Sequence, residues 1–239
     1  MRLIFIRHGE PDYRRDCLTE AGRKQAAALA ERLAGEGITA LYSSSNGRAA
    51  ETAAYTAQRL GLPVTELDWM REISWGGVDV PAGGHPWTLG EMLIDGEGFD
   101  FSASDWRRHP WFADNTALEC FDEIVPKMDA LLRSHGYRHD GGRFFCETAK
   151  EETVALFSHG GSGACALSHL LSLPFPYVCT VLPYGFTSVT ILAFPVREGT
   201  FVHPRIELFN DMAHLPDASG ATALQETPDS RREERPASG

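Results

Sequence analysis

The sequence predicts an α/β protein built on an open sheet, because apolar strand-like runs alternate with helix-like segments along much of the chain. Two of these runs end in the same kind of junction. Residues 3–6 lead into Arg7-His8-Gly9, and residues 153–158 lead into His159-Gly160-Gly161. Because ligands of open α/β sheets bind outside the carboxyl ends of the strands, the two junctions indicate one functional site at one edge of the sheet.

Length and composition fit one large α/β domain, with or without an inserted cap, since the chain has 239 residues of which 43% are hydrophobic. The formal net charge of -11 argues against nucleic acid or an anionic membrane as a partner, although it leaves room for an anionic substrate in a positive pocket. No apolar run reaches the length of a membrane span, and the N-terminus lacks a signal-peptide pattern. The five cysteines are scattered, without a Cys-x-x-Cys pair, so we expect a cytoplasmic protein with reduced thiols.

In the first third of the chain, each predicted strand is followed by polar residues. A helix begins after Thr19, a plausible N-cap, and Gly35 and Gly37 end it. A second strand, residues 38–42, leads through serines and Asn46 to a helix at about 49–60. Arg48 therefore lies near a helix N-terminus, where backbone N–H groups favour an anion.

A third strand at residues 64–67 is followed by Glu72, which stands between aromatic residues. Partial desolvation would raise the pKa of this carboxyl group and suit it to proton donation, although a solvated loop glutamate has the same local pattern.

Residues 78–150 interrupt the alternation, and we interpret them as an insertion that folds over the sheet edge as a partly helical cap. It contains one clear helix, at about 117–134. Downstream, the pattern predicts a helix at 162–171 and strands at 178–182, 187–194 and 201–209. We expect one domain over residues 1–215 and a flexible C-terminal tail over residues 216–239, which is rich in Ala, Ser, Pro, Glu and Arg.

His135 and His139 have the i, i+4 spacing of a metal-binding pair, but Gly136 should end the helix that would align them. We therefore assign no metal ligand and expect no cofactor.

The residues at the predicted strand ends suit phosphoryl transfer. Arginines present planar donors for phosphate, a histidine can attack phosphorus and carry the phosphoryl group, and a carboxylic acid can protonate the leaving oxygen. The arginines would neutralise the charge that Mg²⁺ holds in other enzymes.

Four motifs follow one another along the chain: Arg7-His8-Gly9-Glu10, Leu18-Thr19-Glu20-Ala21-Gly22, the run from Ser43 through Arg48 to Ala53, and Ser158-His159-Gly160-Gly161. In these motifs and in their order the chain resembles the histidine phosphatase superfamily, in its phosphoglycerate mutase-like branch. The resemblance implies a three-layer α/β/α sandwich with a mostly parallel sheet.

The resemblance also implies a role for each matched residue. His8 would be the nucleophile that becomes phosphohistidine, and Glu72 would be the proton donor. Arg7, Arg48 and His159 would bind the phosphoryl group, and Gly160 would offer its backbone N–H. The loop after Glu10 is short and lacks the asparagine that family members often carry there, which makes Arg14 or Arg15 the candidate for an additional phosphate contact.

We expect a metal-independent phosphatase that hydrolyses small phosphomonoesters. The alternatives are a phosphoglycerate-type mutase and a catalytically silent domain that binds phosphate for regulation. Glu147, Glu151 and Glu152 precede His159 where mutases of the family resemble one another in a basic substrate loop, which favours hydrolysis. The full set of matched residues argues against the silent domain.

Overall fold

The computed structural model describes residues 1–96, 98–101 and 104–216. The tail expected over residues 216–239 lies outside this part of the chain, except for its first residue.

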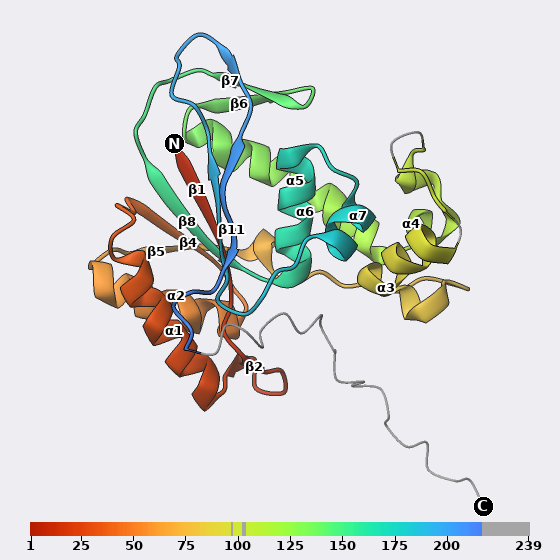
Figure 1. Ribbon diagram of the computed structural model, residues 1–239, viewed down its shortest axis with the longest axis horizontal. Coiled ribbons are helices and arrows are strands. Elements are labelled where there is room, and N and C mark those ends of the chain that lie inside the picture. The colour runs from red at the N-terminus through yellow and green to blue at the C-terminus, as the bar shows by residue number, and fades with distance from the viewer. Residues whose placement is uncertain (97, 102–103, 217–239) are drawn as a thin grey trace, which may run out of the picture.

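A six-stranded sheet forms the centre of the molecule, in the order β11-β9-β1-β8-β4-β5 (Figure 1). Neighbouring pairs among β1, β8, β4 and β5 are parallel, and β9 runs antiparallel to both β1 and β11. The strands are β1 (Arg2–Arg7), β4 (Ala40–Ser44), β5 (Val64–Leu67), β8 (Thr153–Ser158), β9 (Val189–Ala193) and β11 (Arg205–Asp211). The mostly parallel sheet expected from the sequence is confirmed.

Helices cover both faces of this sheet, which gives the expected three layers (Figure 1). One face carries α1 (Glu20–Leu33) and α2 (Gly47–Leu60). The other carries α5 (Thr116–Ser134) and α6 (Gly160–Leu171).

The side chains of β1 explain why its sequence is a continuous apolar run. Ile4 and Ile6 pack in the α1–α2 layer while Leu3 and Phe5 pack in the α5–α6 layer, so both faces of the strand are buried.

The first helix begins where the sequence predicts, with Thr19 as the N-cap whose hydroxyl accepts from the Gly22 amide at 3.0 Å. The loop that follows β1 packs directly on its first turn. A Cβ on Gly9 would meet the Gly22 carbonyl oxygen at 2.8 Å, and a Cβ on Gly22 would meet the Glu10 carbonyl oxygen at 2.2 Å. This close contact with α1 holds the backbone after His8 in place.

This contact predicts that Gly22→Ala destabilises the protein. Alanine would gain up to about 1 kcal/mol of helix propensity. The Glu10 backbone would have to move to admit the methyl group, and overpacking of this kind costs about 1–3 kcal/mol, so the net change is a loss. Urea unfolding checks it, with Gly35→Ala as the control, because a Cβ on Gly35 has nothing within 4 Å. Equal free energies of unfolding for Gly22→Ala and wild type would contradict the prediction.

The segment predicted as an insertion has two parts in the structure. The first contains short helical elements that lie beyond α7 (Phe175–Val181), away from the sheet (Figure 1). They are the 3-10 turns η2 (Pro81–Gly84) and η4 (Trp106–Arg108), the π turn η3 (Met92–Gly96), α3 (Pro86–Glu91) and α4 (Pro110–Ala113). The 3-10 turn η1 (Asp68–Met70) precedes the predicted insertion and contacts β4 and α5. The second part is α5, which packs in the main core, and a hairpin of β6 (Tyr137–Asp140) and β7 (Arg143–Cys146).

Two predicted strands differ in the structure. Residues 178–182 lie mostly in helix α7, because Pro174 and Pro176 start a helix there and a short apolar run does not by itself distinguish a buried helix from a strand. The run at 201–209 divides at Pro204 into β10 (Phe201–Val202), which pairs with β7, and β11, which pairs with β9. A two-stranded ribbon, β2 (Pro11–Asp12) with β3 (Cys17–Leu18), precedes α1.

Among the described residues, no single helix has both the length and the apolar character of a membrane span; α6 and α7 pass that test only as a pair, bent by 118°.

Candidate active site

Four of the six residues predicted for the site meet at the carboxyl edge of β1, β4 and β8. Arg7 ends β1 and His8 follows it, Arg48 lies in the first turn of α2, and His159 is the N-cap of α6. All four side chains are buried, from His159 at 0% exposed to Arg48 at 7%. The parallel strands bring residues far apart in sequence to one edge, as the two His-Gly junctions indicated.

Hydrogen bonds determine which ring nitrogen of His8 carries the proton. Nδ1 lies 2.7 Å from the Gly9 carbonyl oxygen, which only accepts, so Nδ1 carries the proton. Nε2 therefore holds the lone pair, and Arg48 Nε donates to it at 3.3 Å. An oxygen of a bound phosphoryl group would meet the same arginine beside Nε2.

Both histidines are held neutral. Burial lowers the pKa of His8 well below its usual value, and the charges of Arg7 and Arg48 act in the same direction. Burial likewise lowers the pKa of His159, with a further contribution from His8, whose ring centroid is 5.1 Å away. A neutral imidazole at His8 is the form that can attack phosphorus.

Ser44, at the end of β4, positions His159. Its Oγ lies 2.8 Å from His159 Nε2 and also accepts from the Asn46 amide at 3.2 Å. The other ring nitrogen, Nδ1, is buried and has no hydrogen-bond partner among the described residues. It is therefore available to a ligand. In the sequence this serine is one of the polar residues between the second predicted strand and its helix.

Arg48 is held from the opposite side by Asp16. The carboxylate accepts from Arg48 Nη1 at 2.5 Å and from the Gly47 amide at 2.7 Å. Burial alone would raise the pKa of Asp16, but these two donors outweigh it and the net shift is downward. The carboxylate thus caps α2 and orients the arginine. The candidates we expected in this loop, Arg14 and Arg15, are exposed, and Arg15 pairs with Asp12.

Arg7 is positioned by the segment that leads into β9. Its Nη1 donates to the Tyr184 carbonyl oxygen at 2.6 Å, and its guanidinium carbon lies 4.3 Å from the centre of the Phe186 ring. Phe186 also packs on His8, with ring centroids 5.5 Å apart. An aromatic ring therefore covers both residues, a contribution that no sequence motif indicated.

Glu72 lies at the N-terminus of α6, beside the histidine that starts this helix. Its Oε1 accepts from the amides of Gly161 at 2.9 Å and Ser162 at 3.2 Å. Although these bonds and the charges of Arg7 and Arg48 favour the carboxylate, burial outweighs them and the pKa is raised. A carboxyl group that holds its proton at higher pH than usual suits a proton donor.

The two glycines after His159 have different relations to this carboxyl group. A Cβ on Gly161 would meet Glu72 Oε1 at 2.6 Å, so the second glycine makes room for it. Gly160, the predicted source of a backbone donor, is the first residue of α6 and is buried at the same edge.

Asn46 links Glu72 to the arginine cluster. Its Oδ1 accepts from the Glu72 amide at 3.0 Å, and its Nδ2 donates to Asp16 at 3.3 Å. Among the described residues its side chain makes no capping bond to α2, which it precedes. The sequence shows a polar run from Ser43 to Asn46 at the end of a predicted strand. It does not show which residues of this run face the site.

Asn46→Ala is expected to reduce kcat about 2–10-fold for an alkyl phosphate, because it removes one net hydrogen bond of about 0.5–1.5 kcal/mol that holds the Glu72 backbone. Steady-state kinetics checks this, with Ser45→Ala as the control, since the Ser45 hydroxyl bonds the exposed Asp68 instead. An unchanged kcat in Asn46→Ala would show that Glu72 does not depend on this contact.

Comparisons with known proteins give the family of this chain. Residues 3–207 match the model of the histidine phosphatase superfamily (branch 1). A relative from Serratia proteamaculans, named probable phosphoglycerate mutase GpmB, is 28% identical over 184 residues, which cover 73% of this chain and 76% of the relative.

Two solved structures are also similar. The phosphate complex of a mycobacterial glucosyl-3-phosphoglycerate phosphatase is 26% identical with a TM-score of 0.61, covering 90% of this chain and 99% of that one. Phosphoserine phosphatase from Entamoeba histolytica with 3-phosphoglyceric acid is 24% identical with a TM-score of 0.57, covering 90% and 98%, and it supports the fold alone.

The fold and the site together define an enzyme of the phosphoric monoester hydrolase class, as expected from the sequence. The chain belongs to the histidine phosphatase superfamily, branch 1.

Proposed function

We propose that this protein is a metal-independent phosphatase that hydrolyses small phosphomonoesters through a phosphohistidine on His8. The observation that carries the proposal is the state of His8. Its Nδ1 proton is engaged by the Gly9 carbonyl, and its Nε2 lone pair faces Arg48 Nε at 3.3 Å. This arrangement suits a nucleophile that attacks a group bound to the arginine.

In the first step, the Nε2 lone pair forms a bond to phosphorus and the ester P–O bond breaks. Glu72 gives its proton to the departing oxygen, so the product leaves as a neutral alcohol. Arg7, Arg48 and His159 Nδ1 hold the phosphoryl oxygens, and the charge of the arginines offsets the charge of the phosphoryl group.

In the second step, the Glu72 carboxylate takes a proton from water and the oxygen attacks phosphorus. The P–N bond breaks, inorganic phosphate leaves, and His8 returns to its neutral form. Entry of the ester requires covering side chains to move. Phe186 packs on Arg7 and His8, and the exposed ring of Tyr13 lies 5.5 Å from the Arg48 guanidinium carbon.

The test is phosphate release from a panel of phosphomonoesters in the presence of EDTA. Rapid acid-free quenching then traps the protein that carries the labelled phosphoryl group of the substrate. We expect metal-independent release and a phosphoenzyme that is stable in base and labile in acid, as a phosphohistidine is. Release that requires added Mg²⁺, or a labelled protein stable in acid, would overturn the mechanism.

The mutase alternative keeps one point of support, because the relative from Serratia carries that name. The acidic residues that favoured hydrolysis do not bear on the site. Glu147 pairs with Arg133 and Arg138, and Glu152 pairs with His135, at the end of β8 opposite His159. With about 3.3 Å per residue, the six residues of this strand separate Glu152 from the site by roughly 20 Å. Incubation with 3-phosphoglycerate and 2,3-bisphosphoglycerate distinguishes the two activities, since a mutase yields 2-phosphoglycerate and a phosphatase yields inorganic phosphate.

A further inference from the structure

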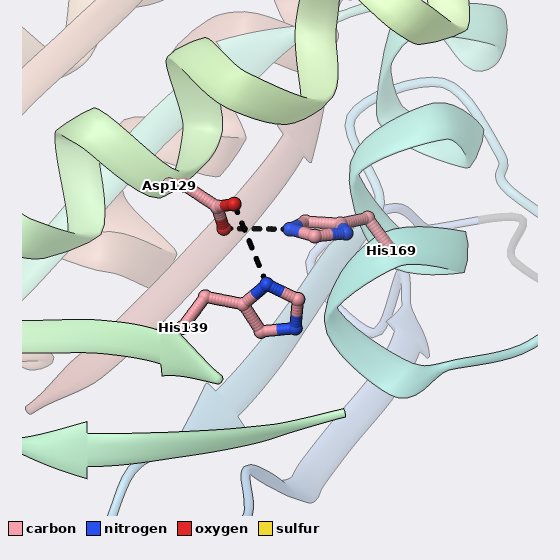
Figure 2. Close-up of side chains that lie close together, drawn as sticks. All are labelled: Asp129, His139 and His169. Carbon is pink, nitrogen blue, oxygen red and sulfur yellow. Dashed lines mark hydrogen bonds and ion pairs between the residues drawn. The ribbon is translucent and has the colours of Figure 1, made fainter. Parts of the chain in front are cut away.

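A second cluster of potential ligands lies outside the active site, where α5, β6 and α6 meet. Asp129 comes from α5, His139 from β6 and His169 from the last turn of α6, and Figure 2 shows both imidazoles turned toward the carboxylate. His169 follows His159 by ten positions along α6, which places it about 15 Å from the phosphoryl site. The proposed mechanism does not use these residues.

We propose that Asp129, His139 and His169 bind one divalent transition-metal ion, with Zn²⁺ as the best match. One ligand atom of each residue lies within 4.8 Å of the others, so small shifts of these side chains bring all three within bonding distance of one ion. His169 Nε2 is 2.6 Å from Asp129 Oδ1, and His139 Nδ1 is 3.4 Å from Asp129 Oδ2. Two imidazole nitrogens and one carboxylate oxygen form a donor set that Zn²⁺ accepts, with water in the fourth position of a tetrahedron.

The surroundings also suit a metal ion. The side chains of Asp129, His139 and His169 are 31%, 23% and 10% exposed, so an ion can enter while the ligands stay ordered by packing. The two imidazole rings pack at 4.5 Å between centroids, and His139 also packs on Phe144. Rings fixed in this way lose little freedom when they coordinate a metal.

Binding requires a change of tautomer at both histidines. The Gly142 amide donates to His139 Nε2 at 3.3 Å, so Nδ1 carries the proton in the metal-free cluster. Coordination through Nδ1 moves this proton to Nε2, and the Gly142 amide, in the turn between β6 and β7, then bonds to water. His169 changes tautomer in the same way: the Nε2 proton that faces Asp129 moves to Nδ1 when Nε2 coordinates the metal, so the ring stays neutral.

From the sequence we expected no metal ligand at His139, because Gly136 separates it from His135. The structure confirms that the two histidines do not meet: His135 bonds Glu152 and Tyr42, whereas His139 turns toward α5 and α6. The pairing of His139 with Asp129 and His169 depends on three elements that the sequence does not show to be adjacent.

The test is a titration of tag-free, EDTA-treated full-length protein with Zn²⁺ by calorimetry, with Co²⁺ as a spectroscopic probe. We expect one equivalent of Zn²⁺ to bind, a rise in Tm, and the visible absorption of tetrahedral Co²⁺. Asp129→Asn and His139→Ala should each weaken Zn²⁺ binding by at least about 10-fold. Replacing a residue that only supports a metal ligand already lowers metal affinity by about this factor, and these two residues would be ligands themselves.

Two controls separate this site from others. His135→Ala removes a histidine bonded to a carboxylate at the nearby end of α5, but outside the cluster, and should leave Zn²⁺ affinity unchanged. His8→Ala should retain the bound equivalent, which excludes binding between His8 and His159.

Two results would overturn the proposal. The first is an absence of stoichiometric Zn²⁺ binding to wild-type protein, which would make the cluster a hydrogen-bonded triad that only ties α5 to α6. The second is equal affinity in wild type and the Asp129 and His139 variants. Phosphatase activity in EDTA tests the proposed function separately.

Discussion

His8→Ala is expected to lower phosphate release by about 10⁴-fold or more, because it removes the atom that bonds to phosphorus and the phosphoenzyme can no longer form. Binding should survive, since Arg7, Arg48 and His159 keep their own supports at Tyr184, Asp16 and Ser44. The measurement is kcat for a phosphomonoester, together with calorimetric binding of inorganic phosphate. The expected pattern is a collapse of kcat with phosphate affinity changed by less than about 10-fold.

The control for this substitution is His203→Ala, which removes an exposed histidine from the segment between β10 and β11 and should leave kcat unchanged. If His8→Ala retained a large part of the wild-type kcat while correctly folded, His8 would not be the nucleophile. If it lost phosphate binding as well, its role would be to shape the anion site, and the covalent mechanism would need other evidence.

Glu72→Gln should separate substrates by their leaving groups. An alkyl phosphate needs a proton on its departing oxygen, so its hydrolysis should slow by about 10²–10⁴-fold. The p-nitrophenolate ion leaves without a proton and its release should change much less. The glutamine carbonyl can still accept from the Gly161 and Ser162 amides, which keeps the start of α6 in place.

The pH profile provides a second readout for the same substitution. Because burial raises the pKa of Glu72, the proton donor is present at low pH and is lost as the pH rises through that value. Because burial lowers the pKa of His8, its neutral form persists below the usual range of histidine. Wild-type activity should therefore extend into acidic solution and fall on the alkaline side. Glu72→Gln should lose this alkaline fall, whereas the ionisation of the substrate affects both enzymes alike.

Glu66→Gln, an exposed glutamate on β5, is the matched control and should keep the wild-type profile. Equal slowing of p-nitrophenyl phosphate and the alkyl phosphate by Glu72→Gln would remove Glu72 from the role of general acid.

The sequence alone was sufficient for the fold class and for the residues that gather at the sheet edge. The short, continuous apolar run at residues 3–6 identifies β1 as a strand buried on both faces. Because parallel strands place their carboxyl ends at the same edge of the sheet, Arg7, His8 and His159 come together when the fold forms. Thr19 likewise marks the start of α1 through a local capping bond. These features depend on neighbours in the chain, which a sequence displays directly.

Only the tertiary structure decided which polar groups face one another across the site. Ser44, Asn46 and Asp16 looked like ordinary loop and capping residues, yet they orient His159, Glu72 and Arg48. The placement of the residues predicted to cap the sheet edge was also decided by the structure. The apolar stripe of α5 is that of any core helix, and only packing assigns this helix to a layer. Contacts between distant segments depend on register and helix orientation to within about an ångström, and spacing along the chain does not contain that information.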